Sequence, residues 1–214
     1  MQYANLRAGG VALAEALGRY RGAADTIVLG IVRGGVPLAD EVARALDLPL
    51  DVVLIKRMFL RDFGASSAAS VAGTRTLDED LREMLAGAPS PERTYLEEAL
   101  GHFAAREELC RQSRAPLDVA GKTVLLVDNG MRSGGTMRIS IRAVRMLEPA
   151  RVVAAVPTGS KDAVEMVQPL ADDLICLSSP APYPHVGMFY KRFDVGSERE
   201  IAATLAAYDH DRAR

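Results

Sequence analysis

The sequence has no excess of either charge, because 26 lysine and arginine residues stand against 28 aspartate and glutamate residues, a formal net charge of −2. Proteins dedicated to nucleic acid usually carry a strong basic excess, so this balance argues against a nucleic-acid partner. The low hydrophobicity of disordered chains is also missing, since hydrophobic residues make up 49% of the sequence. The 214 residues are therefore expected to form a single domain, residues 1–214, that buries its own core.

Cysteine is scarce, and the two cysteines, Cys110 and Cys176, lie far apart in the sequence. They could form one bridge, although we favour a buried, reduced pair. Neither a CxxC pair nor a cluster of cysteine and histidine predicts a zinc site. The apolar runs are strand-sized, far below the roughly 20 residues of a membrane helix, and the first ten residues lack the apolar core of a signal peptide. We therefore expect a cytoplasmic protein without a membrane partner.

Short apolar runs alternate with amphipathic segments along most of the chain, which is typical of a parallel sheet covered by helices on both faces. Strands are expected at residues 26–31, 51–55, 122–127, 152–156 and 174–177. Helices are expected at residues 6–20, 37–46, 91–112 and 136–147, and after residues 160 and 197. The predicted fold class is α/β, with a parallel sheet of about five strands flanked by helices.

Two regions interrupt this alternation. Residues 58–90 separate the second strand from the long helix as an insertion that includes the stretch SSAAS. A weak helix at 77–85 is expected inside it, with Thr76 and Glu79 spaced as a capping box. Residues 178–208 form a tail that starts with a proline-rich irregular part and ends in the last helix.

The segment TVLLVDNGMRSGGT, residues 123–136, carries the strongest indication of chemistry. Its apolar strand ends at Asp128, so this carboxylate is expected at the carboxyl edge of the sheet. Open α/β sheets bind their ligands at that edge. Asp128 is therefore a candidate for binding the hydroxyl groups of a sugar.

The residues that follow have the composition of a phosphate site. Glycines at 130, 134 and 135 let the backbone turn tightly and approach a ligand. Ser133 and Thr136 add hydroxyl donors at a helix start, where unpaired N–H groups and the positive dipole end attract phosphate. A ribose 5-phosphate has its hydroxyls and its phosphate at a comparable separation. The alternative is an ordinary strand–turn–helix junction; the segment is neither a P-loop nor a GxGxxG motif.

Residues 124–136 resemble the ribose-phosphate signature of type I phosphoribosyltransferases: four apolar residues, two acids, spacers, Ser/Thr-Gly, a small residue and Ser/Thr. The stretch GIVRGGVP, residues 30–37, resembles the loop that holds pyrophosphate in this family. The tail CLSSPAPYPHVGMFYKRFDVGSEREI, residues 176–201, is similar to that of a bacterial group of predicted phosphoribosyltransferases of undefined substrate. The resemblance extends from about Leu6 to Leu205. It implies the type I phosphoribosyltransferase fold, with a small hood built from the termini.

The resemblance also implies a reaction and roles for the matching residues. The 5-phosphoribosyl group of phosphoribosyl pyrophosphate would pass to a nucleobase or similar nitrogen acceptor, with Mg²⁺ as cofactor and release of pyrophosphate. The implied catalytic residues are Asp128, Asn129 and Arg33, with Asp128 also contacting the metal. The implied ligand-binding residues are Gly34, Gly35, Lys56, Arg57, Gly130, Met131, Arg132, Ser133, Gly134, Gly135 and Thr136. As alternatives, Arg33 could be a solvated loop residue, and Lys56 and Arg57 a solvated strand end.

One position departs from the family pattern, because Asn129 stands where a second acid is normal. An amide can hydrogen-bond a ribose hydroxyl, but it supplies no charge near the anomeric carbon, and Arg132 adds a cation where a neutral spacer is common. We therefore expect either an enzyme whose activity Asn129 weakens, or a non-catalytic sensor of phosphoribosyl pyrophosphate or nucleotide. A different α/β protein that binds or hydrolyses a phosphate ester is a third hypothesis.

The family places a mobile loop after the second strand, so the resemblance implies that residues 58–90 contain it, with Arg61 and Arg75 as candidate cations. Simple exposed loop positions are an equally good interpretation of both. Residues 180–193 would form the hood over the acceptor. Four side chains there could stack on a flat base: Tyr183, His185, Phe189 and Tyr190. Packing of the tail onto the domain is the interpretation that we favour for at least two of them. Family members commonly dimerise, so a homodimer is expected.

Overall fold

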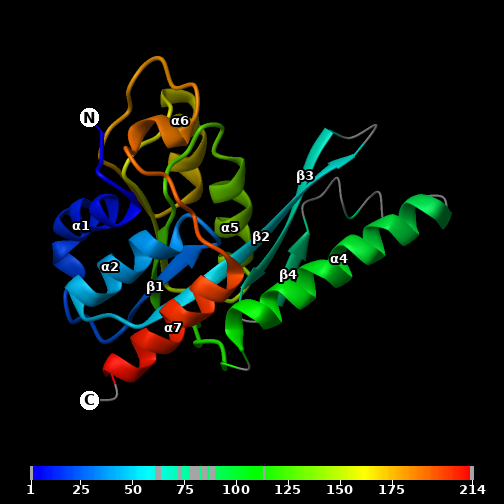
Figure 1. Cartoon of the computed structure of the whole chain (residues 1–214), viewed down its shortest axis with the longest axis horizontal. Helices are drawn as coiled ribbons and strands as arrows, with labels where there is room; N and C mark the ends of the chain where they lie inside the picture. The colour runs from blue at the N-terminus through cyan, green and yellow to red at the C-terminus, as the bar shows by residue number, and fades with distance from the viewer. Residues whose placement is uncertain are drawn as a thin grey trace.

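The computed structural model describes residues 2–60, 64–71, 74–77, 82, 86, 90–112 and 114–212. These residues form one seven-stranded sheet with the strand order β4-β3-β2-β1-β5-β6-β7 (Figure 1). The strands are β1 (Thr26–Ile31), β2 (Leu50–Leu60), β3 (Gly64–Val71), β4 (Thr74–Leu77), β5 (Thr123–Val127), β6 (Arg151–Val156) and β7 (Asp173–Cys176). Five strands run parallel to one another: β2, β1, β5, β6 and β7. At one edge, β3 pairs antiparallel with β2, and β4 pairs antiparallel with β3. The predicted α/β fold with its parallel sheet is confirmed.

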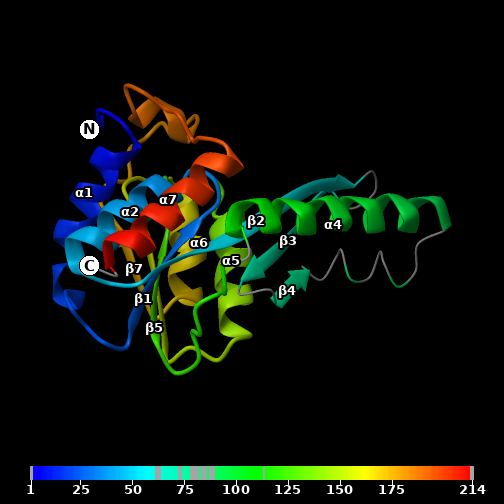
Figure 2. The same ribbon diagram turned by 60° about the horizontal axis from the view of Figure 1, so that its bottom comes forward.

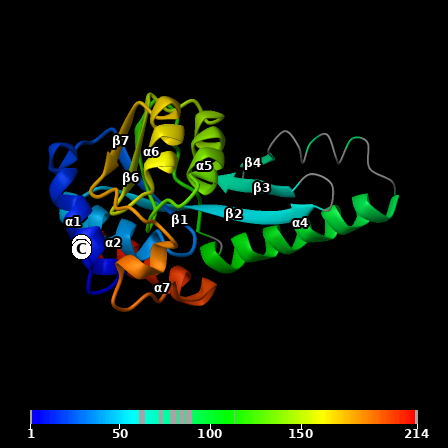
Figure 3. The same cartoon turned by 90° about the horizontal axis from the view of Figure 1, so that it is seen from above.

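Helices cover both faces of the parallel sheet (Figure 3). One face carries α1 (Leu6–Ala16), α2 (Val36–Leu46) and α7 (Glu198–Arg212), and the other carries α5 (Gly135–Arg145) and α6 (Lys161–Val167). Further helices are α4 (Ser90–Arg111) and the short 3-10 helices η1 (Gly18–Tyr20), η2 (Gln168–Leu170) and η3 (Val186–Phe189). Among the described residues, no helix is both long and apolar enough to cross a membrane.

The parallel strands contribute to two hydrophobic cores, because successive side chains of a strand point to opposite faces. Val28 and Leu125 belong to the core that includes α1 and α2, whereas Ile27 and Leu126 belong to the core that includes α5 and α6. All six residues of β1 are buried. Burial on both faces explains why the central strands are continuous apolar runs in the sequence.

Local signals fix where several helices begin. Pro37 lies in the first turn of α2, where its missing N–H costs nothing. Ser160 is the N-cap of α6 and accepts a hydrogen bond from the N–H of Ala163 at 3.0 Å. The capping box at the start of α7 is present, since the N–H of Ser197 donates to the Glu200 carboxylate at 2.7 Å and the N–H of Glu200 donates to the Ser197 hydroxyl at 3.3 Å.

The region after residue 58 differs from the loop that the sequence predicts. β2 continues to Leu60 and pairs with β3, which in turn pairs with β4. Thr76 and Leu77 are therefore strand residues. The helix predicted at residues 77–85 is wrong at its first residue, Leu77. Glu79 and Arg61 lie outside the described residues, and Arg75 lies in β4. The small residues of β3 have little strand preference of their own, but pairing with an existing strand satisfies their backbone groups.

The far part of β2, together with β3, β4 and α4, makes an arm that projects from the body of the domain (Figures 1 and 2). Buried charges anchor its base to the sheet. Arg111 of α4 pairs with Asp51 of β2 at 2.8 Å and with Glu107 at 3.3 Å, and the hydroxyl of Ser70 donates to Glu107 at 2.7 Å. The network joins α4 to two strands.

Both ends of the chain contribute to a small hood above the carboxyl edge of the sheet. The N–H of Tyr3 donates to the carbonyl of Phe189, and the N–H of Lys191 donates to the carbonyl of Tyr3, both at 2.8 Å. The start of the chain is thereby tied to the tail that follows β7. This agrees with the expected hood from the termini.

Candidate functional site

Two loops meet at the carboxyl edge of the sheet because the strands before them are neighbours. β1 leads into residues 32–35, and β5 leads into residues 128–134, while Gly30 and Val127 are register partners. The loops touch, since the side chain of Asn129 occupies the space that a Cβ on Gly34 would need. Only glycine at position 34 allows this close approach. Nothing in the sequence pattern of either loop predicts this contact, because it depends on the pairing of β1 with β5.

Asp128 is the carboxylate at this edge. It follows β5 directly and is only 8% exposed, and its Oδ1 accepts a hydrogen bond from the N–H of Asn129 at 2.8 Å. Burial raises the pKa of Asp128 to about 7, although the bond from Asn129 acts in the opposite direction. A buried carboxyl group with spare oxygen lone pairs can accept hydrogen bonds from the hydroxyls of a sugar.

A cavity of about 200 Å³ opens beside Asp128. Its lining is the unbroken run from Asp128 to Met137, together with Val186 of the tail. The structure therefore brings together Asp128, Asn129, Gly130, Met131, Arg132, Ser133, Gly134, Gly135 and Thr136, which the sequence had grouped.

The backbone of this run presents unused donors. Within the described chain, none of the N–H groups from Arg132 to Met137 donates to any other group. α5 begins at Gly135, and its N-cap Gly134 has a φ of +71° and no side chain to cap the helix. Free N–H groups at the positive end of a helix form a ready anion site. The geometry suits the phosphate of a sugar ester held next to Asp128.

The loop after β1 also presents backbone N–H groups without acceptors, although fewer of them. The N–H groups of Arg33 and Gly34 have no acceptor in the described part of the chain, and the Arg33 side chain is exposed and makes no ion pair there. The peptide bond between Val32 and Arg33 is cis. By contrast, the N–H of Gly35 donates to the carbonyl of Ile31 at 2.8 Å, and a Cβ on Gly35 would lie 2.7 Å from that oxygen. Gly35 is therefore required for packing, and its contact with a ligand stays a prediction.

Lys56 and Arg57 lie in β2, on the far side of β1 from the cavity. Lys56 is half-buried and pairs with Ala68 of β3, and Arg57 pairs with Ser67. Lys56 does not line the cavity, and the side chain of Arg57 lies outside what the structure describes. Their contact with pyrophosphate remains a prediction.

The aromatic residues of the tail pack against the loops. Tyr190 is only 4% exposed, with its ring centroid 5.7 Å from that of Tyr3 and 5.6 Å from that of Phe193. Tyr183 and Phe189 stack on each other with centroids 4.7 Å apart. Burial raises the pKa of the Tyr183 hydroxyl to about 12. Tyr190 therefore packs the tail onto the domain, as we favoured for part of this group.

His185 is exposed and lies just before η3. It makes no hydrogen bond or ion pair through its side chain within the described residues. The structure therefore gives His185 no contact with the cavity.

Residues after β6 support the site, and the sequence analysis missed this role. The N–H of Met131 donates to the carbonyl of Thr158 at 3.0 Å, and the N–H and hydroxyl of Ser160 donate to the carbonyls of Met131 and Arg132 at 2.8 and 2.7 Å. The sequence did mark Ser160 as a helix start. A Thr-Gly-Ser turn that follows a buried strand at the same edge was the available signal.

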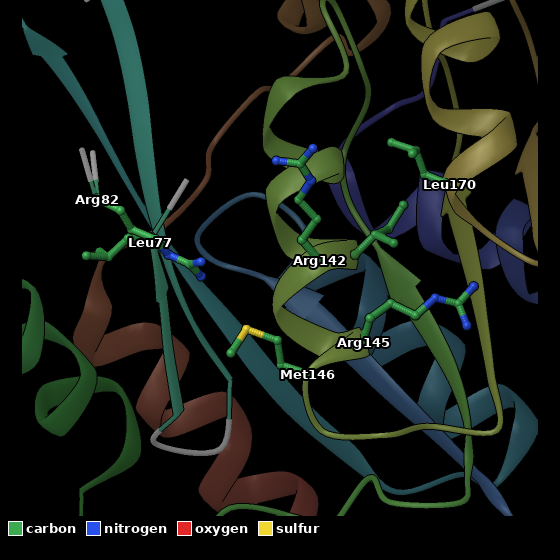
Figure 4. A pocket seen from close by; sticks show the side chains of 7 residues that line it. Leu77, Arg82, Arg142, Arg145, Met146 and Leu170 are labelled. Atoms are coloured by element: carbon green, nitrogen blue, oxygen red, sulfur yellow. The ribbon is translucent and has the colours of Figure 1, made fainter. Parts of the chain in front are cut away.

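A larger cavity of about 600 Å³ lies elsewhere, between α5, η2 and the β4 side of the arm (Figure 4). Arg82, Arg142 and Arg145 line it together with Leu77, Ile141, Met146 and Leu170. Arg145 is paired with Asp172 at 2.7 Å. This cavity borders the last turns of α5, away from the helix start that carries the free N–H groups, and shares no lining residue with the cavity beside Asp128.

No group of three or more histidine, cysteine, aspartate or glutamate side chains in the described part of the chain is arranged to hold a metal ion. Mg²⁺ needs no such cluster, because it commonly binds through one or two carboxylates together with substrate phosphates and water. The single carboxylate of Asp128 beside the anion site fits that mode of binding.

Comparison with known proteins points to one family. Residues 2–188 match the model of the phosphoribosyl transferase domain. A protein of Mycobacterium tuberculosis strain H37Rv, named "Putative phosphoribosyl transferase Rv0571c", is 33% identical over 208 residues, which cover 94% of this chain and 46% of the relative. The chain thus spans about half the length of this curated relative. The crystal structure of the protein TT1426 from Thermus thermophilus is 33% identical, with a TM-score of 0.77, and the match covers 97% of this chain and 99% of that one.

Proposed function

We propose that this chain, which belongs to the phosphoribosyltransferase family, transfers the 5-phosphoribosyl group of phosphoribosyl pyrophosphate to a nucleobase or similar nitrogen acceptor. One observation carries the proposal: a buried carboxylate, Asp128, lies in the same cavity as a run of backbone N–H groups without acceptors. The carboxylate suits the ribose hydroxyls, and the N–H groups suit the 5-phosphate.

The first loop would receive the pyrophosphate. Its free N–H groups at Arg33 and Gly34 and the exposed Arg33 guanidinium are donors for a diphosphate. The contact of Asn129 with Gly34 keeps this loop against the ribose side of the site. A single bound molecule could therefore span both loops.

The reaction forms a bond between an acceptor nitrogen and C1 of the ribose as the bond between C1 and the pyrophosphate oxygen breaks. The electrons of the broken bond leave with pyrophosphate, and the acceptor loses its proton to solvent. Mg²⁺, bound with the substrate, would supply positive charge for the leaving pyrophosphate next to Asp128. The chain itself contributes mainly position and electrostatics: Asp128 orients the ribose, and the N–H groups hold the phosphate still while C1 moves.

The acceptor would bind under the tail. Val186 lines the same cavity as Asp128, which supports a hood over C1. We further propose that residues 58–90 contribute a segment that closes over the site and that the chain is a homodimer, both by analogy with the family.

The test is a pyrophosphate-release assay with phosphoribosyl pyrophosphate, Mg²⁺ and a panel of nucleobases. We expect turnover with at least one base. Asp128→Ala and Thr136→Val should each weaken binding of phosphoribosyl pyrophosphate about tenfold, the loss of roughly one hydrogen bond to a charged group, and leave the protein folded. Normal affinity in both variants contradicts the site assignment.

A non-catalytic sensor of phosphoribosyl pyrophosphate is the second candidate, and the neutral side chain of Asn129 at an acidic position of the family pattern favours it. The sensor would bind the ligand but release no pyrophosphate with any base. Asn129→Asp separates the two: restored turnover in this variant indicates a sensor or a decayed enzyme, whereas turnover already present in the wild type indicates an enzyme.

A further inference from the structure

A tyrosine of the tail reaches the backbone of residues 128–134, which are called the phosphate loop because the proposed function gives them this ligand. The Tyr190 hydroxyl donates a hydrogen bond to the carbonyl of Asn129 at 2.6 Å, although the two residues lie 61 positions apart in the sequence. The Tyr190 ring is held between Tyr3 and Phe193, and it is almost fully buried. The hydroxyl is therefore a fixed point from which the loop can be oriented.

The bond acts on the peptide between Asn129 and Gly130. In a trans peptide the C=O and N–H point in opposite directions. Holding the Asn129 carbonyl toward the tail therefore turns the N–H of Gly130 away from the tail. Gly130 lines the cavity, and its N–H has no acceptor among the described residues. Gly130 has a φ of +155°, a conformation that only glycine adopts easily, so side-chain sterics do little to fix this peptide plane.

Two further carbonyls of the loop are also held by hydrogen bonds. Ser160 donates to the carbonyls of Met131 and Arg132, through its N–H at 2.8 Å and its hydroxyl at 2.7 Å. Beyond them begins the run of N–H groups without acceptors. Tyr190 and Ser160 thus hold three carbonyls of the loop, while the N–H groups from Arg132 to Met137 have no acceptor among the described residues.

We propose that Tyr190 is a positioning residue for the phosphoribosyl site, whose hydroxyl fixes the Asn129–Gly130 peptide so that the Gly130 N–H faces the ligand. The proposal rests on the proposed function only in its last step, where the ligand is a phosphoribosyl compound. Its first step, that the hydroxyl orders the loop, concerns the free protein. The role differs from stacking on a base, because the ring is buried and the acting group is the hydroxyl.

Tyr190→Phe tests the first step, because it removes the hydroxyl and keeps the ring. In the ligand-free protein we expect amide hydrogen exchange at Asn129 and Met131 to become about tenfold faster, the effect of losing roughly one hydrogen bond. Tyr208→Phe is the matched control, since the buried Tyr208 hydroxyl donates to the carbonyl of Leu48. Leu48 lies just before the start of β2, at the edge of the sheet opposite to residues 128–134. The control should leave exchange at Asn129 and Met131 unchanged.

Titration with ribose 5-phosphate, and with phosphoribosyl pyrophosphate and Mg²⁺, tests the second step. Tyr190→Phe should raise the dissociation constants about five- to tenfold, and Tyr208→Phe should not, even where both variants lose similar thermal stability. Wild-type exchange rates at Asn129 and Met131 in Tyr190→Phe overturn the proposal, whatever the ligand. Faster exchange in a protein that binds neither compound supports the ordering of the loop and instead contradicts the proposed function.

Discussion

At the scale of one residue, burial of Asp128 places a carboxylate where a ligand could contact it but lowers the stability of the ligand-free protein. The carboxyl group is buried, accepts only one hydrogen bond within the described chain and has its pKa raised from 3.8 to about 7. In the unfolded chain the same group ionises near its ordinary pKa. Folding therefore opposes ionisation of Asp128, and the free protein is less stable for carrying it.

The sign of this effect gives a prediction for Asp128→Asn. Below about pH 4 Asp128 is protonated in both the folded and the unfolded chain, so it does not change the free energy of unfolding. Between about pH 4 and pH 7 the unfolded chain ionises while the folded chain does not, and the free energy of unfolding falls by up to about 4 kcal/mol. Above about pH 7 both states are ionised, and this loss stays constant. Asp128→Asn removes this loss. The unfolding free energy of Asp128→Asn minus that of the wild type, measured by urea titration without ligand, should increase from pH 4 to about pH 7 and then stay level. A difference that is constant or shrinks over this range would contradict the raised pKa of Asp128.

Single residues also show how far the sequence alone could go. The grouping of Asp128 with the glycines of the loop at 128–134 was predictable, because an acid at the end of an apolar strand, followed by Ser-Gly-Gly-Thr at a helix start, is a local sequence pattern. The supports at Tyr190 and Ser160 were not, since they reach the loop from 61 and 28 positions away. Nothing in the local pattern specifies such contacts, which depend on where the tail and α6 pack.

At the scale of elements, four of the five parallel strands were predicted to within one residue at each end, whereas β2 continues five residues beyond its predicted end at 55 and the arm was not predicted. Strands buried on both faces must be continuous apolar runs, and this leaves a clear pattern. β3 has the sequence GASSAASV, which shows neither an apolar run nor alternation. Its strand conformation comes from pairing with the extended β2, so tertiary context overrides a loop-like composition.

The base of the arm gives a prediction of its own. Arg111 is 7% exposed at its side chain and pairs with Asp51 and Glu107. In Arg111→Met, Asp51 keeps its contact with Arg114 at 3.1 Å, whereas the largely buried Glu107 loses the ion pair with Arg111. We expect a loss of about 3–5 kcal/mol in the free energy of unfolding. Asp51 lies at the start of β2, the opposite edge from the ligand loops, so affinity for ribose 5-phosphate should stay unchanged in the folded variant.

Arg106→Met is the matched control on the same helix. Arg106 pairs with Glu198 at 2.9 Å, but both side chains are partly exposed, so solvent already screens the pair. This variant should lose no more than about 1 kcal/mol. Equal losses in Arg106→Met and Arg111→Met, measured in urea, would show that the buried network does not anchor the arm.

At the scale of the whole molecule, sheet topology produces the site. β1 and β5 are far apart in the sequence but adjacent in the sheet, so the loops that follow them meet at one edge. The tail then returns over that edge and contacts both the N-terminal residues and the phosphate loop. Ligand binding is thus expected to couple three segments that the sequence separates.

Titration of ¹⁵N-labelled protein with ribose 5-phosphate, monitored by the chemical shifts of the backbone amides, tests most directly whether the loop after β5 binds a sugar phosphate. We expect the largest shifts at the amides from Arg132 to Met137, with smaller ones at Asn129 and Gly130. Saturable shifts confined to the cavity at the other end of α5, around Arg142 and Arg145, would contradict it, as would the absence of any shift at millimolar ligand.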